Sequence, residues 1–113
     1  MAECIFCKIA AGALPAQVVQ WDTGLVAIED RNPQAPTHLL VMPVEHHANL
    51  HDVAVDDPAL MARLMELAAK LGRERGGDKG FRLVVNTGRD GGQTVDHVHV
   101  HVLAGRRMDW PPG

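Results

Sequence analysis

Residues 97–102 read His-Val-His-Val-His-Val, and this alternation is the most informative stretch of the chain. Successive side chains of a β-strand point to opposite faces of a sheet, so a strand here places three histidines on one face and three valines on the other. The valine face suits a buried core. Neighbouring imidazoles would originate about 6.5–7 Å apart, at a rise of about 3.3 Å per residue. The stretch therefore predicts a functional histidine face rather than a single satisfied core histidine.

Two chemical interpretations of this histidine face are open from the spacing alone. Three histidines could hold a catalytic zinc ion with an open fourth position, as in a metal hydrolase. Alternatively, one neutral imidazole could act as a nucleophile while its neighbour binds the group under attack. The alternation of residues does not separate the two.

The segments around the histidines predict an antiparallel sheet. Apolar or extended runs are separated by turn-forming residues, among them Thr23-Gly24, a proline-broken loop at 29–36 and a glycine-rich loop at 87–93. Strands are predicted at 16–21, 25–28, 39–42, 81–86 and about 94–103. The last of these includes the histidine face.

One long helix interrupts the strands. Asp56-Asp57-Pro58 resembles a helix N-cap followed by proline, and leucines 60, 64, 67 and 71 then recur at helical spacing until Gly76-Gly77. A short helix is predicted at 5–11, ending at Gly12. We therefore expect one α+β domain over residues 1–113, with helices on one side of an antiparallel sheet.

Composition narrows the function classes. The chain has 113 residues, 11 Lys and Arg, 14 Asp and Glu, and a formal charge of -3. Neither sign forms a long block, which disfavours binding to duplex nucleic acid. The N-terminal residues 1–12 fit neither a signal peptide nor a membrane span, so we expect a cytoplasmic protein that does not act at a membrane.

The two cysteines, Cys4 and Cys7, have the spacing of half a zinc site or of a redox pair. A thioredoxin-like pair is expected within a βαβ pattern, which this N-terminus lacks. Zinc needs about four nitrogen or sulfur ligands, and there is no third cysteine. Histidines must therefore complete any zinc site.

The sequence as a whole resembles the histidine triad (HIT) family, and within it the Hint-like branch of purine nucleotide hydrolases. The hallmark is the His-x-His-x-His motif followed by apolar residues. The resemblance covers nearly the whole chain, and further matching segments are Cys4–Ile9, Asp30–Pro43, Asn86, Gly91–Val95 and the terminal Trp-Pro-Pro-Gly at 110–113.

This resemblance implies a HIT-like fold, a homodimer, and hydrolysis of purine nucleoside phosphoramidates such as adenosine 5'-monophosphoramidate or AMP-lysine. AMP would be released through a covalent nucleotidyl-histidine intermediate. His99 matches the nucleophile and His101 the histidine that contacts phosphate. His38 matches the remote histidine that supports protonation of the leaving group, and the Thr94 hydroxyl would lie near the leaving amine.

The resemblance also implies a nucleotide site and a structural metal site. Asp30, beside Arg31, would accept the ribose hydroxyls, because a carboxylate offers two acceptor oxygens to two adjacent donors. The remaining nucleotide-binding candidates are Asn86, Gly92, Gln93 and Thr94 for phosphate, Ile5, Phe6, Ile28 and Leu40 for the base, and Trp110 in the tail. The zinc-bearing bacterial members imply one structural Zn²⁺ per chain, held by Cys4, Cys7, His46 and His97.

Some residues depart from the family pattern. His47 directly follows His46 and could compete as a ligand, while Asp96 and Asp109 are acidic where relatives are often aromatic or histidine. Met108 and Trp110 stand beside Pro111-Pro112 with little local core to join, so we expect the tail to reach toward a partner subunit. The alternative function is a non-catalytic nucleotide-binding or regulatory interaction protein.

Overall fold

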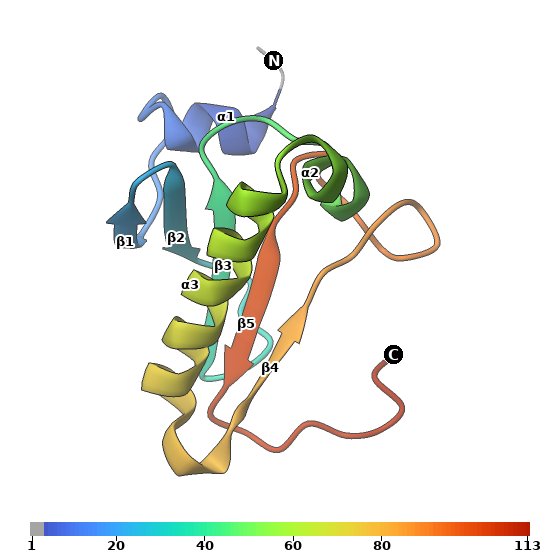
Figure 1. Ribbon diagram of the computed structural model, residues 1–113. Coiled ribbons are helices and arrows are strands. Elements are labelled where there is room, and N and C mark those ends of the chain that lie inside the picture. Colours follow the sequence, from blue (N-terminus) through green and yellow to red (C-terminus); the bar gives the residue numbers. More distant parts are fainter. Residues whose placement is uncertain (1–3) are drawn as a thin grey trace.

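The computed structural model describes residues 4–113, and these form a five-stranded antiparallel sheet with helices on both faces (Figure 1). Residues 1–3 of the segment compared above with signal peptides lie outside the described part. The elements in chain order are α1 (Ile5–Ala10), β1 (Val18–Asp22), β2 (Leu25–Glu29), β3 (Thr37–Pro43), α2 (Leu50–Asp56), α3 (Pro58–Gly76), the 3₁₀ helix η1 (Gly77–Lys79), β4 (Phe81–Val84) and β5 (Val100–Ala104). The spatial order of the strands is β1-β2-β3-β5-β4. The predicted α+β class and antiparallel sheet are confirmed.

The central strands divide the core by alternation. Leu39 and Val41 of β3 face one layer of apolar residues, which includes Val98, Val100 and Val102. Leu40 and Met42 belong to a second cluster on the other face. The predicted valine face is therefore buried, and the histidines are left on the opposite side of β5.

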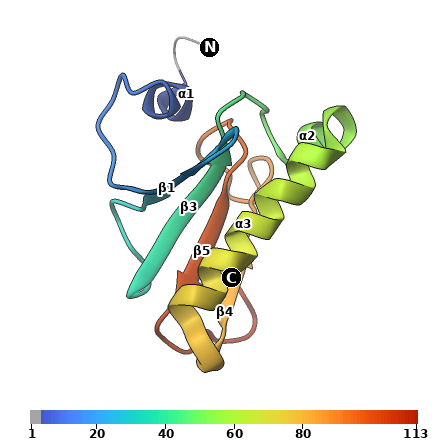
Figure 2. The same ribbon diagram turned by 60° about the vertical axis from the view of Figure 1, so that its left-hand side comes forward.

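Helix α3 covers the valine face and runs roughly along the direction of β5 (Figure 2). Its start follows the predicted capping pattern, because the Asp57 side chain accepts the Leu60 N–H at 3.0 Å. Pro58 suits the first position of the helix, because it has no N–H that would lack an acceptor there. Leu64 and Leu71 are almost fully buried against the strands. The helix ends where Gly77 adopts a φ of 56°.

The prediction that the helices lie on one side of the sheet is wrong. Phe6 and Ile9 of α1 pack in the second cluster, with Val26, Leu40 and Met42, on the face opposite α3. A short helix carries too few apolar residues to reveal which face it covers.

A further helix, α2, was not predicted. The Asn49 side chain caps it by accepting the Asp52 N–H at 3.0 Å, and of its residues only Val53 is buried. Seven residues with one buried side chain give no helical periodicity.

The last two strands are shorter than predicted. β4 ends at Val84, and β5 begins at Val100 instead of Thr94. Strand β3 ends at Pro43, which has no N–H for a ladder, and the Val98 N–H instead donates to the His47 carbonyl at 2.7 Å. The backbone of residues 94–99 is therefore hydrogen-bonded to the segment before α2, through Val98, and is not part of the ladder with β3. The valines and histidines still alternate in this stretch. In the described part of the chain no helix is both long and apolar enough to cross a membrane.

Candidate active site

An apolar cavity of about 490 Å³ lies between α1, β2 and β3. Its walls include all four residues predicted to surround a base, Ile5, Phe6, Ile28 and Leu40, and the polar pair Asp30 and Arg31 at the end of β2. An apolar body with a few polar groups at one edge is typical of small-molecule sites. The structure thus brings together six of the thirteen predicted nucleotide-binding residues.

His99 stands directly before β5 and is 6% exposed. Its Nδ1–H donates to the His97 carbonyl at 2.8 Å, because a carbonyl can only accept. A neutral imidazole carries one proton, so Nε2 of His99 is left with a free lone pair. The ring packs against the edge of Phe6, with centroids 5.0 Å apart, and Phe6 also lines the cavity. The neutral ring therefore has the tautomer that a nucleophile needs, and it is next to the cavity through its contact with Phe6.

His101 and His38 form a hydrogen-bonded pair across β5 and β3. The Gln34 N–H donates to Nδ1 of His38 at 3.0 Å, so the proton of the neutral His38 ring is on Nε2. This Nε2–H donates to Nδ1 of His101 at 2.9 Å. The proton of the neutral His101 ring is therefore on Nε2, where it can serve a ligand as a donor.

Burial keeps this pair neutral. It lowers the pKa of His101 to about 4, with a further lowering from the neighbouring His99 and His38. It also lowers the pKa of His38, although the Asp30 carboxylate, 3.4 Å away, partly opposes this. Both rings are consequently hydrogen-bonding groups rather than cations near neutral pH.

An arginine that sequence reasoning missed supports this pair from outside. Arg106 Nε–H donates to the Gln34 carbonyl at 2.8 Å, while the N–H of the same Gln34 fixes the His38 proton. Arg106 follows β5 by two residues and Gln34 precedes β3 by three, so the two loops meet at the end of the sheet. No spacing signal in the sequence connects them.

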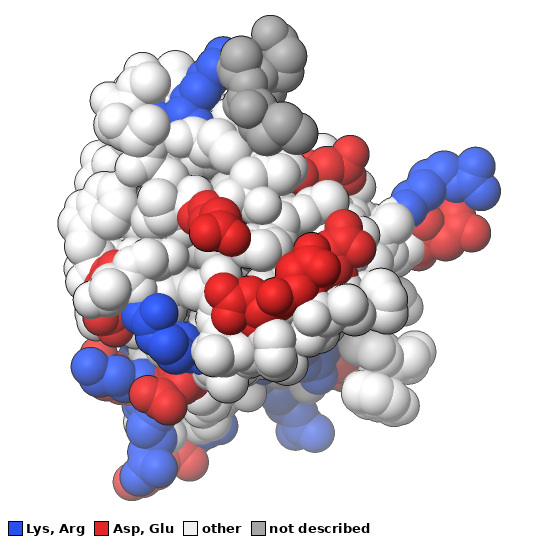
Figure 3. All heavy atoms as spheres, turned by 45° about the horizontal axis from the view of Figure 1, so that its top comes forward, with Lys and Arg blue, Asp and Glu red and all other residues white. Residues whose placement is uncertain are grey.

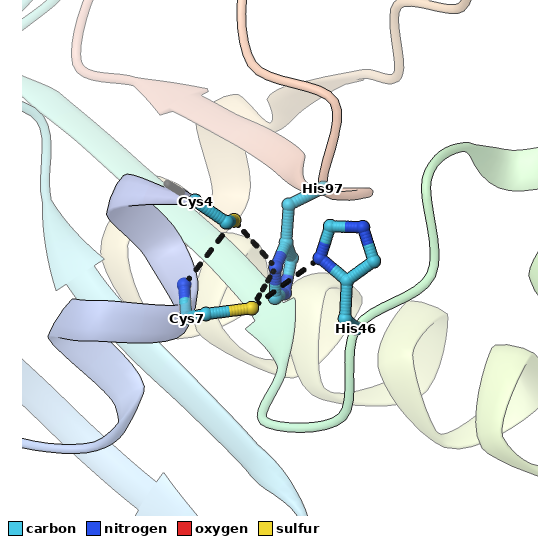
Figure 4. A group of neighbouring side chains, drawn as sticks. All are labelled: Cys4, Cys7, His46 and His97. Carbon is cyan, nitrogen blue, oxygen red and sulfur yellow. Dashed lines mark hydrogen bonds between the residues drawn. The ribbon is translucent and has the colours of Figure 1, made fainter. Parts of the chain in front are cut away.

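A second cluster of side chains surrounds His97, the first histidine of the alternating motif (Figure 4). Cys4 and Cys7 come from the start of α1, His46 from the loop after β3, and His97 from the segment before β5. Cys7 Sγ lies 3.3 Å from His46 Nδ1 and 3.5 Å from His97 Nδ1, and Cys4 Sγ lies 3.4 Å from His97 Nδ1. All four predicted metal ligands are thus brought together, and His47 is directed instead to Glu45, at 2.9 Å.

The donor set fits a tetrahedral zinc ion. The usual Zn–S and Zn–N bond lengths give sulfur–nitrogen separations of about 3.5 Å, close to those observed. The Nε2–H of the fully buried His97 donates to the Pro43 carbonyl at 2.8 Å, which leaves Nδ1 as the free ligand atom, the arrangement that orients metal-bound histidines. Burial and the neighbouring Cys4 raise the pKa of the Cys7 thiol, so a cation would displace a proton on binding.

Within residues 4–113 one other group, Asp30, His38 and His101, has ligand atoms close enough to share a metal. Nδ1 of His38 already accepts the Gln34 N–H. A metal on Nε2 would therefore require an imidazolate ring, with no proton on either nitrogen. The hydrogen-bonded pair described above accounts for this group better. The three triad histidines face three different partners and do not form one ligand set, which disfavours the catalytic-zinc interpretation.

The other predicted phosphate-binding residues are placed less directly. The Gln93 side chain donates to the Ala48 and Val95 carbonyls at 2.7 and 3.1 Å and accepts the Gly88 N–H at 3.0 Å, so it links its loop to the segment before α2. Thr94 and Gly92 are exposed in that loop. Asn86 lies two residues beyond Val84, the partner of His101, in the segment that follows β4.

Trp110 is not brought to the cavity. Its side chain is 82% exposed, and the tail is anchored at the preceding Asp109, whose carbonyl accepts a hydrogen bond from Arg82 at 3.0 Å.

Comparisons with known proteins agree with this geometry. Residues 11–108 match the model of the HIT domain. A HIT family hydrolase from Legionella pneumophila is 49% identical with a TM-score of 0.93, covering 98% of this chain and 100% of the other. A Zn-bound histidine triad family protein from Mycobacterium smegmatis is 34% identical with a TM-score of 0.78, over 96% of this chain and 79% of the other. A hypothetical histidine triad nucleotide-binding protein from Sulfolobus tokodaii has the same identity and TM-score, over 96% and 72%.

Proposed function

The chain belongs to the HIT family, and from this premise we propose that it is a nucleotidyl hydrolase that cleaves the P–N bond of purine nucleoside phosphoramidates. The observation that carries the proposal is the state of His99, whose Nδ1 proton is held by a backbone carbonyl while Nε2 is free beside an apolar cavity. The relatives described as a HIT family hydrolase and as a nucleotide-binding protein support the substrate class.

The cavity suits the nucleoside part of such a substrate. A purine would fill the space between Ile5, Phe6 and Leu40, and the ribose hydroxyls would donate to Asp30 at its polar edge. Asp30 Oδ1 already accepts the Asn32 N–H at 2.8 Å, but each carboxylate oxygen has a second lone pair. The base would then lie on the α1 side of the sheet, on the same face as the histidines.

The reaction would proceed in two displacements. Nε2 of His99 attacks the α-phosphorus, the bond from phosphorus to the leaving nitrogen breaks, and that nitrogen takes up a proton from solvent to leave as the amine. His101 Nε2–H would donate to a phosphoryl oxygen as charge develops, and the chain from Gln34 through His38 holds that donor in place. Water then attacks phosphorus and loses a proton to solvent, the bond to His99 breaks, and AMP leaves.

Hydrolysis of a fluorogenic adenosine phosphoramidate by the wild type and by His99→Ala tests the mechanism. We expect His99→Ala to keep the fold and AMP binding but to lose about three orders of magnitude or more in kcat, because the attacking atom is gone. His101→Ala should also be slow, through weaker phosphate stabilisation. Near-normal turnover of His99→Ala would contradict the mechanism, and AMP affinity without turnover by the wild type would favour the non-catalytic binding protein.

The cluster of Cys4, Cys7, His46 and His97 is proposed to hold one structural zinc ion per chain. When bound, the ion would cross-link α1 to the loop after β3 and to the segment that carries His99. A site closed by four protein ligands leaves no position for substrate. The Zn-bound relative from M. smegmatis supports this assignment.

Metal analysis of the purified protein should find about one zinc per chain. Chelation, or Cys7→Ser, should lower Tm by about 10 °C or more while activity at moderate temperature falls much less. Immediate loss of activity in a chelated protein that remains folded would instead favour the metal hydrolase.

A further inference from the structure

A second cavity, of about 570 Å³, lies at the end of the sheet where α3 terminates. Its lining shares no residue with the apolar cavity. Cationic side chains contribute four of the seven lining residues, and none of the seven is acidic; they are Arg75, Gly76, Lys79, Gly80, Gly105, Arg106 and Arg107. Because the whole chain carries a formal charge of -3, this concentration does not follow from general basicity.

The fold creates this cluster by joining two distant parts of the chain. Phe81, the first residue of β4, pairs with Ala104, the last residue of β5. The end of α3 and η1, which precede β4, are therefore held beside the segment that follows β5. In Figure 1 these segments meet at the bottom of the molecule.

Other parts of the surface have a different charge. Figure 3 shows the top of the molecule obliquely, with acidic side chains across the centre of the view and basic ones toward its edges. Four cationic side chains around one cavity raise the local concentration of anions there.

One of the four cations is held in place by hydrogen bonds. Arg106 donates from Nε to the Gln34 carbonyl and from Nη1 to the Arg107 carbonyl, at 2.8 and 3.0 Å, and its Nη2 remains to donate to a ligand. Arg75 Nη1 lies 3.7 Å from Glu29 in an exposed ion pair, with which an anion would compete. Holding a guanidinium before a ligand arrives reduces the entropy lost on binding.

Two glycines of the lining have backbone conformations that side chains disfavour. Gly80 and Gly105 have φ values of 89° and 96°, which other residues rarely adopt, and at Gly105 a Cβ would meet Pro36 at 2.8 Å. No side chain from these two positions therefore fills the space, and their backbone can approach a ligand closely.

We propose that this cavity binds a small anion with two or three adjacent phosphoryl groups, such as inorganic triphosphate or the phosphate tail of a nucleotide. A single phosphate would occupy only part of the volume and meet only part of the charge. Arginines pair with phosphoryl oxygens in two-pronged geometry, and three arginines with one lysine match a chain of phosphates. The cluster is compact rather than a stripe along the surface, which disfavours a nucleic acid duplex.

Titration calorimetry with inorganic triphosphate and the zinc-loaded protein tests this site. We expect one bound triphosphate per chain, about tenfold weaker binding for Lys79→Ala or Arg107→Ala, and about a hundredfold for the double variant. Lys70→Ala and Arg89→Ala remove the same charge outside the cavity and should change the affinity less than twofold. ATP and AMP are titrated in parallel to distinguish the two sources of the ligand. A site for the phosphate tail of a nucleotide should bind ATP as well as free triphosphate.

Three outcomes would overturn the proposal. They are no binding to the wild type, equal weakening in the two control variants, and displacement of triphosphate by saturating AMP, which would place it in the apolar cavity. None of these outcomes depends on phosphoramidate hydrolysis, so this experiment tests the anion site independently of the proposed function.

Discussion

At the scale of single residues, backbone contacts decide what each histidine can do. His97, His99 and His38 are chemically identical in the sequence, but their protons are fixed by the Pro43 carbonyl, the His97 carbonyl and the Gln34 N–H respectively. The free nitrogen is consequently Nδ1 at His97 and Nε2 at His99. One alternating motif thereby supplies a candidate metal ligand and a candidate nucleophile only two residues apart.

The lowered pKa of His101 predicts a pH-dependent stability. In the unfolded chain this histidine takes up a proton near pH 6.5, whereas in the folded protein it does so only near pH 4. Between these values the unfolded state binds more protons, so the stability contributed by the neutral ring is complete above about pH 6.5 and is lost as the pH falls toward 4. We expect His101 to account for a loss of about 1–3 kcal/mol over this window, after allowance for its partial exposure.

Denaturant unfolding of wild type and His101→Asn at pH 7 and pH 4.5 measures that loss. The asparagine cannot take up a proton, so the stability advantage of the wild type over this variant should shrink at the lower pH. Comparing the two proteins cancels the contributions of histidines that do not contact His101 and of any metal released by acid. An advantage that stays constant with pH would show that His101 is not kept neutral by the fold.

Residue types and spacing indicated the histidine face and the half-site at Cys4 and Cys7, and the family resemblance supplied the partners. What the sequence could not reveal is which atom of each ring is free, because that depends on carbonyls brought near by the fold. The tether from Arg106 to Gln34 is of the same kind: it joins two loops 72 positions apart. The side-chain hydrogen bonds of Gln93, which link its loop to Ala48, are likewise not visible in the sequence, and its binding of phosphate stays a prediction.

At the scale of elements, α1 shows how a short segment can be essential. Six residues are too few for a stable isolated helix. The Cys4 side chain caps its start by accepting the Cys7 N–H at 3.3 Å, and Phe6 and Ile9 are buried against the sheet. The same helix supplies walls of the apolar cavity and two of the candidate metal ligands, so a metal there would stabilise the cavity as well.

The approach of α3 to β4 depends on Gly72. A Cβ at this position would lie 2.3–2.7 Å from the Phe81 ring, including its inner Cγ atom, so the ring or the helix must shift. We expect Gly72→Ala to lower the free energy of unfolding by about 1–3 kcal/mol, although alanine favours helices over glycine.

Gly76→Ala is the matched control in the same helix. Its nearest neighbours would be at 3.4 Å or more, and its φ of -86° and ψ of -26° are helical. Denaturant unfolding should therefore find this variant as stable as the wild type or slightly more stable. If Gly72→Ala and Gly76→Ala changed the free energy of unfolding equally, close packing of α3 against β4 would not be the reason for a glycine at position 72.

Strong local signals predicted α3 and the central strands correctly, because capping residues and apolar periodicity act within a few residues of one another. The start of β5 was wrong for a different reason. Alternation at 97–102 continues through residues without ladder partners, since the neighbouring strand ends at Pro43. A side-chain pattern records which face is buried, and pairing depends on a strand that is far away in the sequence.

At the scale of the whole molecule, the edge strands β1 and β4 each pair on one side only among the described residues, and the end of the tail beyond Asp109 is exposed. β4 pairs only with β5, and Phe81 on this edge strand is 38% exposed. Trp110, further along the chain, is 82% exposed. Unpaired edges and exposed aromatic residues are typical of interfaces, so the proposed homodimer would bury β4, part of α3 and the tail.

Light scattering at micromolar concentration should therefore give twice the mass of the chain. In the proposed dimer the tail crosses toward the partner's leaving-group pocket, whereas the nucleoside cavity is made by α1, β2 and β3 of one chain. Deleting residues 110–113 should then change the relative kcat/KM for different leaving amines by about tenfold, while the affinity for AMP changes less than twofold. Trp110→Ala should reproduce most of this effect if the indole is the contact. A monomer in solution would contradict the dimer, and an unchanged order of leaving amines after the deletion would show that the tail is not part of the site.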